Sequence, residues 1–346
     1  MIQEALQKLV TGAKLSQEEA GGVTEEIMTG EATPGQIGAF LLALRITGES
    51  VEEITGMAKV MREKALRVLT DGEVVDVVGT GGDGMGTFNI STAAALVTAA
   101  AGVKVAKHGN RAASGRFGAA DILESNGVKL ELTPDSVKRC IEEVGIGFMF
   151  APAFHPAMRF AGPIRREIGV RTVFNILGPL TNPAGASYQL LGAGQLTSAL
   201  DGGQAPLGEM LASVLASLGT KHSWVVRGDD GLDELTTTTT TQVWEVTGGR
   251  VRHFETGPED AGLGRVPLAD IQAADSTANT AMFLDSLSAR ECAAKDIVLL
   301  NAAGALVVAG RVADLRAGVA IAREHIDSGE ALQKLHQLVA LTQMLD

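Results

Sequence analysis

The chain contains few cysteines and few aromatic residues. Of its 346 residues, two are cysteine, Cys140 and Cys292, and 4% are aromatic. Two cysteines that lie far apart in the sequence supply neither a disulfide framework nor a CxxC metal site. Both of these ways of holding a fold together are therefore excluded.

The chain also lacks long apolar runs and an excess of positive charge. No stretch reaches the roughly 18 uncharged apolar residues that a transmembrane helix needs. The first ten residues, MIQEALQKLV, are amphipathic and lack the apolar core of a signal peptide. The formal net charge of −12 argues against nucleic acid or an anionic membrane as a partner. We expect a cytoplasmic protein that binds neither.

Hydrophobic residues and glycine, in contrast, are abundant. Hydrophobic residues make up 45% of the chain, and 42 residues are glycine. This content allows a substantial buried core, and the glycines suit the tight loops of an α/β protein. The length fits one large domain with a smaller one.

The first 70 residues carry only helical signals. Capping boxes, in which a hydroxyl residue is followed three positions later by Glu or Gln, begin at Ser16, Thr33 and Ser50. Pro34 occupies a favourable first helical position, and apolar residues recur at helix spacing over 37–44. We expect helices here and no strand before Glu73.

From Glu73 onward the pattern changes to strands that alternate with helices. Strands are predicted at 73–78, 103–106, 147–151 and 223–226, and helices from Ile90 and from Thr133-Pro134. This alternation indicates βαβ units and a mostly parallel sheet flanked by helices.

Three segments do not follow the alternation. Residues 156–190 are less regular and rich in Pro and Gly. Residues 195–208 are atypical and are interpreted as a loop without a role. The six consecutive threonines at 236–241 are interpreted as an exposed or strand-edge segment that has no chemistry.

The stretch VGTGGDG at 78–84 places four glycines after a predicted strand. Gly79, Gly81 and Gly84 satisfy the G-x-G-x-x-G pattern of dinucleotide-binding folds. Such folds also need a helix that starts at the loop and an acidic residue about 20 positions on for the ribose. Here the helix starts later, at 89–92, and the second strand ends in the basic pair Lys107-His108. The sequence therefore favours phosphate over a dinucleotide, and a tight turn without a ligand stays an alternative.

Loops at the carboxyl ends of neighbouring parallel strands face a common crevice. We therefore expect the segments 79–84, 89–92 and 107–115 to meet there. Their backbone N–H groups and a helix N-terminus suit anions. Their side chains add two cations and three hydroxyls: Lys107, Arg111, Ser91, Thr92 and Ser114. Asp83 suits a sugar hydroxyl or the water shell of a metal, and His108 is interpreted as a structural or hydrogen-bonding residue. Together these features describe a site for a polyphosphorylated sugar.

Two further pairs of charged residues fit such a site. Asp233 and Glu234 stand side by side in GDDGLDE at 228–234. Adjacent carboxylates in a loop are often only solvated, but beside a pyrophosphate they are good ligands for Mg²⁺. Arg165 and Arg166 stand in GPIRREIG at 162–169. One of them can clamp a planar carboxylate bidentately, while the other lies at the surface.

Six motifs in this order resemble the anthranilate phosphoribosyltransferases over nearly the whole chain. They are GTGGDG at 79–84, NIST at 89–92, KHGNRAAS at 107–114, HPAMR at 155–159, RTVFNILGPLTNP at 171–183 and GLDE at 231–234. The resemblance implies an α/β fold of the nucleoside phosphorylase and phosphoribosyltransferase type. A small helical domain would comprise 1–70 with roughly 160–190, and a large α/β domain 71–159 with 191–346.

The resemblance also implies an activity. The family transfers the phosphoribosyl group of phosphoribosyl pyrophosphate to the amine of anthranilate in tryptophan biosynthesis, giving N-(5-phosphoribosyl)anthranilate and pyrophosphate. It uses Mg²⁺ and is usually a homodimer joined through the helical domain. An aryl amine needs no deprotonation before it attacks, so placement and charge stabilisation are the enzyme's tasks. We expect no dedicated catalytic acid or base.

The same resemblance assigns residues to each ligand. Magnesium would be held by Ser91, Asp233 and Glu234, and anthranilate by Gly79, Asn110 and Arg165, the last through the carboxylate. Phosphoribosyl pyrophosphate would contact Gly79, Gly82, Asp83, Thr87, Asn89, Ile90, Ser91, Thr92, Lys107, His108, Gly109, Asn110, Arg111, Ala112, Ala113, Ser114, Gly115 and Ala119. Ala119 and Gly115 stand where the family often has hydroxyl residues, so we expect one hydroxyl contact to the phosphates to be absent.

Two rival functions stay open at this point. Pyrimidine nucleoside phosphorylases share the implied fold, although the KHGN, HPAM and RTVFN motifs argue against them. A non-catalytic nucleic-acid-binding module is the other rival, and the net charge of −12 together with Asp233 and Glu234 argues against it.

Overall fold

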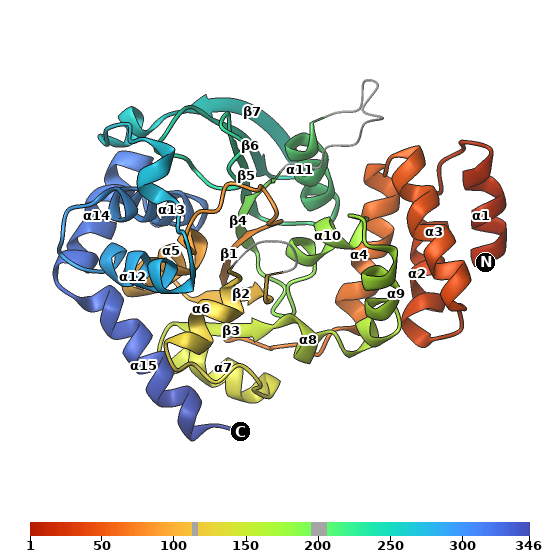
Figure 1. Ribbon diagram of the computed structural model, residues 1–346, viewed down its shortest axis with the longest axis horizontal. Coiled ribbons are helices and arrows are strands. Elements are labelled where there is room, and N and C mark those ends of the chain that lie inside the picture. Colours follow the sequence, from red (N-terminus) through yellow and green to blue (C-terminus); the bar gives the residue numbers. More distant parts are fainter. Residues whose placement is uncertain (113–116, 195–205) are drawn as a thin grey trace.

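The N-terminal part of the chain is helical, as predicted. The computed structural model describes residues 1–346 apart from 113–116 and 195–205. Its first four helices lie together at one end of the molecule (Figure 1): α1 (Ile2–Val10), α2 (Gln17–Thr29), α3 (Pro34–Thr47) and α4 (Val51–Lys64). The capping boxes at Ser16, Thr33 and Ser50 all form, with both reciprocal hydrogen bonds present in each. The sequence signals for these helix starts are confirmed.

The centre of the molecule is a seven-stranded sheet in the order β3-β2-β1-β4-β5-β6-β7. Its strands are β1 (Val75–Gly79), β2 (Val105–Gly109), β3 (Ile146–Phe150), β4 (Tyr188–Gly192), β5 (His222–Gly228), β6 (Thr241–Thr247) and β7 (Arg250–Thr256). Strands β1 to β5 pair in parallel, and β6 and β7 add an antiparallel hairpin. Its turn uses Gly248 and Gly249, both at positive φ.

The strand order reverses between β1 and β4. At such a switch point the connections leave towards opposite faces of the sheet, and a crevice remains beyond the carboxyl ends of the strands. The fold itself therefore places a binding site just after Gly79 and Gly192, where these two strands end.

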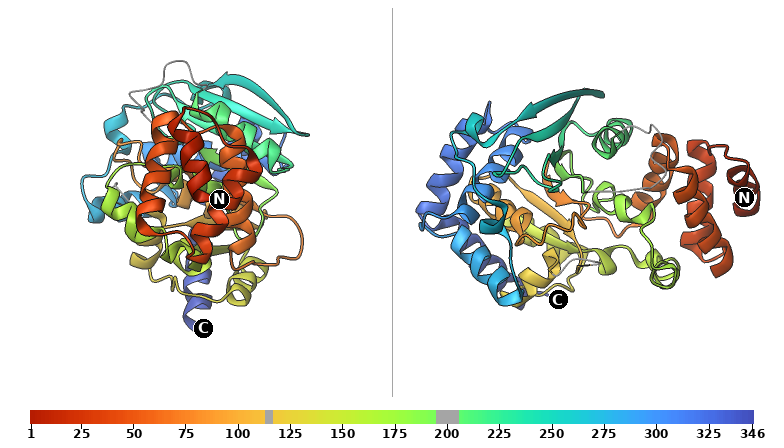
Figure 2. Two further views of the ribbon diagram at one scale, coloured as in Figure 1. Left: turned by 90° about the vertical axis from the view of Figure 1, so that its right-hand side faces the viewer. Right: turned by 45° about the horizontal axis from the view of Figure 1, so that its top comes forward.

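Helices cover both faces of the sheet (Figures 1 and 2). One face packs on α5 (Ile90–Ala100) and α13 (Ala293–Val308), which α14 (Leu315–Asp327) and α15 (Glu330–Met344) cover in turn. The other face packs on α11 (Leu207–Ser217), which also contacts α4. Successive side chains of β4 point to opposite faces, so Leu190 joins the core beneath α13 and Leu191 the core beneath α11.

Short helices join these layers. They are α6 (Ala119–Ser125), α7 (Pro134–Glu143), α8 (Ala151–Phe154), α9 (Gly162–Ile168), α10 (Phe174–Leu177) and α12 (Ser276–Ser286), with 3-10 turns at Pro156–Arg159, Gly178–Leu180, Pro258–Ala261 and Leu268–Ile271. Helix α9 packs on α3 and α10 on α4, and Phe174 shares one core cluster with α2 to α4. Helices α9 and α10 of the segment 160–190 therefore lie against the N-terminal helices, whereas Tyr188 begins β4 of the central sheet. The domain boundaries stay a prediction.

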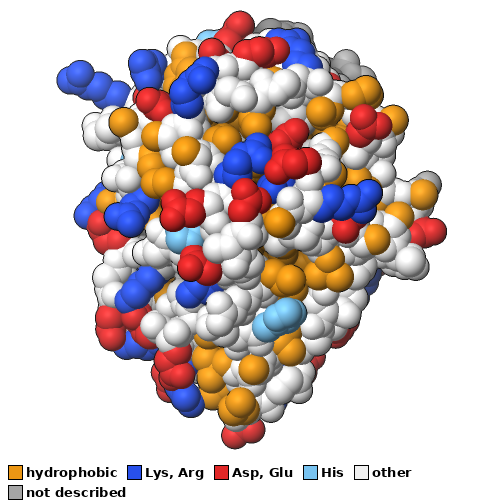
Figure 3. Space-filling view, turned by 90° about the vertical axis from the view of Figure 1, so that its left-hand side faces the viewer, with side chains coloured by type: hydrophobic (Ala, Val, Ile, Leu, Met, Phe, Trp, Pro, Cys, Tyr) orange, Lys and Arg blue, Asp and Glu red, His pale blue; other side chains and the backbone are white. Residues whose placement is uncertain are grey.

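Charges of both signs are interspersed on the face formed by the C-terminal helices (Figure 3). Ion pairs join many of them, such as Arg323 with Glu291 and Arg290 with Asp285. Lys295 lies fully buried in this layer and pairs with Glu291 and Asp327. Negative charge on this face is therefore interspersed with positive charge.

The interpretation of the threonine run as an exposed segment is wrong. Thr236, Thr237 and Thr241 are almost completely buried, and Thr241 is the first residue of the internal strand β6. The hydroxyl of Thr236 donates to Asp230 and that of Thr241 accepts from the N–H of Thr236, whereas the hydroxyl of Thr237 has no partner among the described residues. Of the other unassigned segment, 195–208, the first eleven residues lie outside the described part of the chain, and Leu207 opens α11.

Candidate active site

A cavity of about 1350 Å³ opens at the carboxyl ends of the central strands. Its walls come from the loop after β1, the start of α5, the end of β2, the segment from α8 to α10, and the pair Asp233-Glu234 after β5. The predicted ligand-contacting residues that line it are Gly79, Gly82, Asp83, Thr87, Asn89, Ile90, Ser91, Lys107, His108, Gly109, Asn110, Arg111, Ala112, Ala119, Arg165, Asp233 and Glu234.

Four predicted residues are not among them. Thr92 lies in the first turn of α5 and is fully buried, and its hydroxyl has no hydrogen-bond partner within the described residues. Ala113, Ser114 and Gly115 lie outside the described part of the chain. The structure therefore brings nearly all of the predicted site residues that it describes to one cavity.

Some positions of the glycine loop lack a side chain because other groups of the protein occupy the space that a Cβ would need. A Cβ at Gly79 would lie 2.5 Å from Oδ2 of Asp233, and one at Gly82 would lie 1.1 Å from Nη2 of Arg171. Gly81, Gly84 and Gly86 have positive φ, as Gly82 does, but nothing lies within 4 Å of the place a Cβ would take at these three. Gly84 and Gly86 leave space beside the backbone, whereas the N–H and the carbonyl of Gly81 are already bonded to Asp233 and Arg171.

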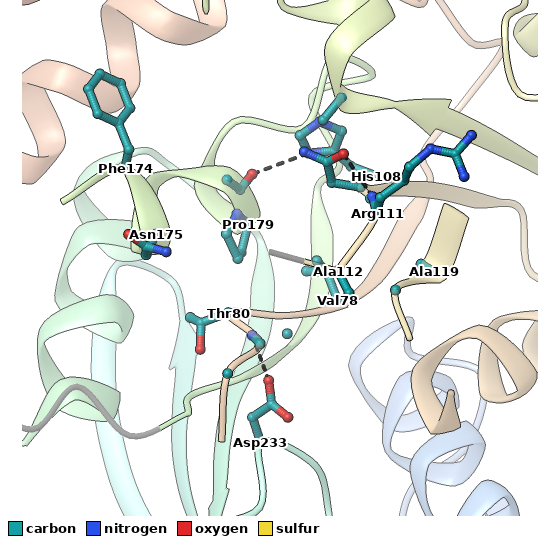
Figure 4. Close-up of a pocket in the computed structure, with 18 of the residues that line it drawn as sticks. Val78, Thr80, His108, Arg111, Ala112, Ala119, Phe174, Asn175, Pro179 and Asp233 are labelled. Carbon is teal, nitrogen blue, oxygen red and sulfur yellow. Dashed lines mark hydrogen bonds between the residues drawn. The ribbon is translucent and has the colours of Figure 1, made fainter. Parts of the chain in front are cut away.

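The acidic pair is tied to the glycine loop. The N–H of Gly81 donates to Oδ2 of Asp233 over 2.8 Å (Figure 4). Burial raises the pKa of Asp233 well above its usual range, and the nearby charges of Asp83 and Glu234 raise it further. Burial also raises the pKa of Glu234 to about 8, against the opposing effect of Lys107. Three carboxyl groups are thus held together in a partly desolvated place, where a cation would relieve their repulsion.

The donor set fits a magnesium ion. The described residues contain no group of three or more His, Cys, Asp or Glu side chains arranged to hold a metal by themselves. Mg²⁺ does not need one, because it usually takes one or two carboxylates and completes its shell with water and phosphate oxygens. The N–H of Ser91 donates to the Glu234 carboxylate, so the three predicted metal ligands lie near one another.

Lys107 lies within β2 and not in the loop that the sequence predicted. The strand continues to Gly109, and the Lys107 side chain is only 1% exposed. Its ammonium group donates to the carbonyl of Val77 and, over 3.2 Å, to Oγ of Ser91. Burial lowers the pKa of Lys107, while Asp76 and Glu234 favour the charged form. This cation sits beneath the start of α5, next to the predicted metal ligands.

Arg111 does not offer a free positive charge to the cavity. Its guanidinium donates to Asp121 over 3.1 Å and to Glu124 over 2.6 and 2.8 Å. In Figure 4 its side chain extends away from Asp233 and Thr80. Arg111 was expected to be a phosphate-binding cation, because nothing in the sequence around it indicates that the carboxylates of α6, ten and thirteen residues further on, fold back onto it.

Arg165 is the better placed of the two adjacent arginines. Its guanidinium carbon lies 5.2 Å from the ring centroid of Phe174, and burial lowers the pKa of Arg165. Arg166 also reaches the cavity wall but is exposed. Neighbouring residues of a helix point about 100° apart, so α9 presents one arginine inward and the other to solvent.

Sequence reasoning missed two side chains in the cavity, His155 and Arg171. The rings of His155 and His108 lie 5.0 Å apart, and burial lowers their pKa values to about 4 and about 3. The Nδ1 atom of His108 lies 3.2 Å from the carbonyl oxygen of Gly178, and Nε2 of each ring has no partner among the described residues. Arg171 donates to the carbonyl of Gly81. His155 stands in the motif HPAMR and Arg171 in RTVFN. Their place in these motifs was the sequence signal that could have identified them as site residues.

The chain matches known families along its length. A model described as the helical bundle domain of a glycosyl transferase family matches residues 3–65, and one described as its a/b domain matches residues 71–332. The anthranilate phosphoribosyltransferase of Chloroflexus aurantiacus is 53% identical over 343 residues, which are 99% of this chain and 98% of the relative. The chain belongs to the anthranilate phosphoribosyltransferase family. The anthranilate phosphoribosyltransferase of Dehalococcoides mccartyi is 49% identical over 347 residues, which are 100% of this chain and 99% of the relative.

Solved structures of anthranilate phosphoribosyltransferases share the whole fold. The Thermus thermophilus protein superposes with a TM-score of 0.89 at 43% identity, over 98% of this chain and 99% of that one. The Saccharomyces cerevisiae protein in complex with PRPP and Mg reaches 0.89 at 27% identity, over 99% and 98%. The predicted fold class, family and enzymatic activity are confirmed.

Within the described residues, no helix has the length and apolar character needed to cross a bilayer. The cytoplasmic location stays a prediction.

Proposed function

We propose that the cavity is the active site in which this chain transfers the phosphoribosyl group of phosphoribosyl pyrophosphate to the amine of anthranilate. One observation carries this assignment. The glycine loop with its acidic pair, and the half-buried Arg165, were predicted for two different substrates and line a single cavity. Relatives from Saccharomyces cerevisiae described in complex with PRPP and Mg, and with 4-fluoroanthranilate, support the same pair of ligands.

The phosphate end of the first substrate would lie between the glycine loop and α5. Gly84 and Gly86 leave space beside their backbone there, and α5 points its N-terminus at the same space, which favours anions. Lys107 adds a buried positive charge below it. Magnesium would be held by Ser91, Asp233 and Glu234, and when bound it would neutralise charge that builds on the departing pyrophosphate.

The anthranilate end would lie toward α9. Arg165 has the planar, forked guanidinium that suits a carboxylate, and its partial burial strengthens that interaction. Asn110, at the end of β2, faces the same cavity. The groups that would bind the two substrates thus come from different parts of the chain. The loops at the carboxyl ends of the strands lie on one side and the segment 160–175 on the other.

The residues of the cavity support a reaction without proton transfer by a side chain. The bond between the anomeric carbon and pyrophosphate breaks as the amine lone pair forms the new C–N bond, and the product amine then releases a proton to water. His108 and His155 are neutral near pH 7, because burial holds their pKa values at about 3 and about 4. They add no positive charge that would oppose the cationic sugar of the transition state.

A second copy of the chain is the partner that we propose. Val10 on α1 and Leu42 and Ile46 on α3 are 81%, 39% and 65% exposed, although they are large and apolar, and these two helices are in contact. Such a face is typical of an isologous dimer. The Ile46→Asp substitution should convert a dimer into a monomer, as measured by sedimentation velocity. A wild-type protein that sediments as a monomer at all concentrations would contradict the proposal.

The activity is tested by following the loss of anthranilate fluorescence with phosphoribosyl pyrophosphate and Mg²⁺, with and without EDTA. We expect turnover that stops when EDTA removes the metal and returns when Mg²⁺ is restored. Phosphorolysis of thymidine or uridine is the control reaction, and rapid cleavage there without pyrophosphate would favour a nucleoside phosphorylase instead.

A further inference from the structure

The threonine run closes the loop that carries Asp233 and Glu234. Asp230 stands before the pair and Thr236 after it, and the hydroxyl of Thr236 donates to Oδ2 of Asp230 over 2.8 Å. The hydroxyl of Thr238 donates to the same oxygen. One carboxylate therefore joins the two ends of the segment 230–236, and the predicted metal ligands lie between them.

The other oxygen of Asp230 orders the start of the same loop. Oδ1 accepts from the N–H of Leu232 over 3.0 Å, and the N–H of Gly228 donates to the Leu232 carbonyl over 2.9 Å. The space beside Asp230 is fully used, because a Cβ on Gly228 would lie 2.2 Å from Oδ1. Asp230 thus fixes the turn from within, through both of its oxygens.

The far end of the loop is fixed to the sheet and to α13. The N–H of Thr236 donates to Oγ1 of Thr241, the first residue of β6, over 3.0 Å. Asn301 of α13 accepts from the N–H of Leu235 over 2.9 Å and donates to its carbonyl over 2.8 Å. Glu234 is therefore followed directly by residues that cannot shift without breaking buried hydrogen bonds.

We propose that Asp230, Thr236 and Thr238 are positioning residues that hold Asp233 and Glu234 in the geometry that binds the metal. This inference rests on the proposed function of the acidic pair. Two adjacent carboxylates beside Asp83 repel one another, so an unrestrained loop would carry them apart and into water. The hydroxyl groups of the run supply the restraint, and partners of this kind around metal ligands typically change metal affinity by 10- to 100-fold.

The run itself offers a matched control. The hydroxyl of Thr239 has no hydrogen-bond partner within the described residues, and its side chain is half-buried like that of Thr238. Replacing either threonine by valine keeps the shape and removes only the hydroxyl. Thr238→Val and Thr239→Val therefore differ in whether the lost group faces Asp230.

The test measures Mn²⁺ binding in the presence of inorganic pyrophosphate by electron paramagnetic resonance, because Mn²⁺ takes the same oxygen ligands as Mg²⁺. We expect Thr236→Val to weaken Mn²⁺ binding by roughly 10-fold or more, Thr238→Val to weaken it less, and Thr236→Ser to restore it. Thr239→Val should stay within about twofold of wild type on the same scale. The KM for anthranilate should change in none of them.

The outcomes separate this inference from the proposed function. Weak binding in Asp233→Asn/Glu234→Gln with unchanged binding in Thr236→Val and Thr238→Val would overturn the positioning role and leave the metal ligands intact. Unchanged binding in the double variant would overturn the metal assignment itself. Urea unfolding accompanies each variant. If Thr236→Val proves unfolded, the comparison of Thr238→Val with Thr239→Val decides, and equal Mn²⁺ affinities in those two would reject the inference.

Discussion

Asp233 and Gly81, 152 residues apart in the sequence, are joined by a hydrogen bond of 2.8 Å from the Gly81 N–H to the Asp233 carboxylate. The bond links the loop after β1 to the loop after β5, across β4. The glycine at 79 makes this approach feasible, since a Cβ there would lie 2.5 Å from the same carboxylate oxygen. The acidic pair and the glycine loop therefore form one unit at the switch point of the sheet.

The first prediction concerns the acidic pair. Asp233→Asn with Glu234→Gln should nearly abolish turnover, because the loss of both carboxylates removes direct metal ligands and several kcal/mol of leaving-group stabilisation, on the order given for metal-ion catalysis. Circular dichroism should remain that of wild type, since the amides are nearly isosteric. The fluorescence assay measures the effect, and near wild-type turnover in the folded double variant would show that the metal is held elsewhere.

The second prediction concerns Lys107. Lys107→Met keeps much of the side-chain volume but removes the charge beneath Ser91, so the KM for phosphoribosyl pyrophosphate should rise much more than that for anthranilate. Lys107→Ala should show the same selectivity with an added loss of stability, because it also leaves a cavity at a side chain that is 1% exposed. Titration of each substrate at saturating concentrations of the other measures both constants. The reverse selectivity would mean that Lys107 serves the other substrate.

Local patterns in the sequence were sufficient to predict much of the fold. A capping box such as Ser50 with Glu53 specifies a helix start through groups only three residues apart, and it forms as predicted. The alternation of strands and helices indicated a parallel sheet for the same reason, since it depends on short segments. The site motifs could be collected into one crevice because they follow strands that a parallel sheet must place side by side.

Contacts between distant segments could not be predicted. Nothing near Arg111 indicates that Glu124 will pair with it, and the burial of the threonine run depends on Asp230 and on strand β6. The extension of β2 through His108 likewise depends on pairing with β3. In each case the decisive partner is fixed by tertiary packing, which a local pattern does not contain.

The third prediction concerns stability in acid. Burial lowers the pKa of His108 from 6.5 to about 3 and that of His155 from 6.5 to about 4. Below pH 6.5 the unfolded chain therefore binds protons that the folded chain does not. The free energy of unfolding then decreases as the pH is lowered, by up to ~1.4 kcal/mol per pH unit for each histidine. Asp76 opposes this between 3.8 and about 6, because burial raises its pKa and the folded state then binds more protons.

Urea unfolding at several pH values tests this balance. Asp233 and Glu234, whose pKa values burial also raises, act in the same direction as Asp76, so the contribution of a histidine is obtained from the difference between a variant and the wild type by the linkage relation. His155→Gln should become more stable relative to wild type as pH falls from 6.5 to about 4, because the proton uptake of that histidine in the unfolded chain is lost. His336→Gln, at an exposed histidine of α15, should keep the pH dependence of the wild type. A free energy of unfolding of His155→Gln that runs parallel to that of wild type over this window would contradict the neutral state of His155.

The last prediction concerns the cation that recognises anthranilate. The substrate's one full charge is its carboxylate, and the cavity offers Arg165, half-buried over Phe174, and Arg166, exposed. A charge-assisted, forked pair that is partly desolvated contributes on the order of 2–3 kcal/mol. At about 1.4 kcal/mol per decade this corresponds to a factor of roughly 30 to 150.

Arg165→Ala should therefore raise the KM for anthranilate by roughly 30- to 150-fold on that scale, with little change for phosphoribosyl pyrophosphate. Arg165→Lys should recover only part of the loss, because an ammonium group keeps the charge but lacks the fork. Arg166→Ala is the matched control on the same helix and should be nearly silent, since its side chain is directed to solvent. Steady-state kinetics on the three variants decide between the arginines. An unchanged anthranilate KM in Arg165→Ala, or a large rise in Arg166→Ala, would show that Arg165 is not the residue that binds the carboxylate.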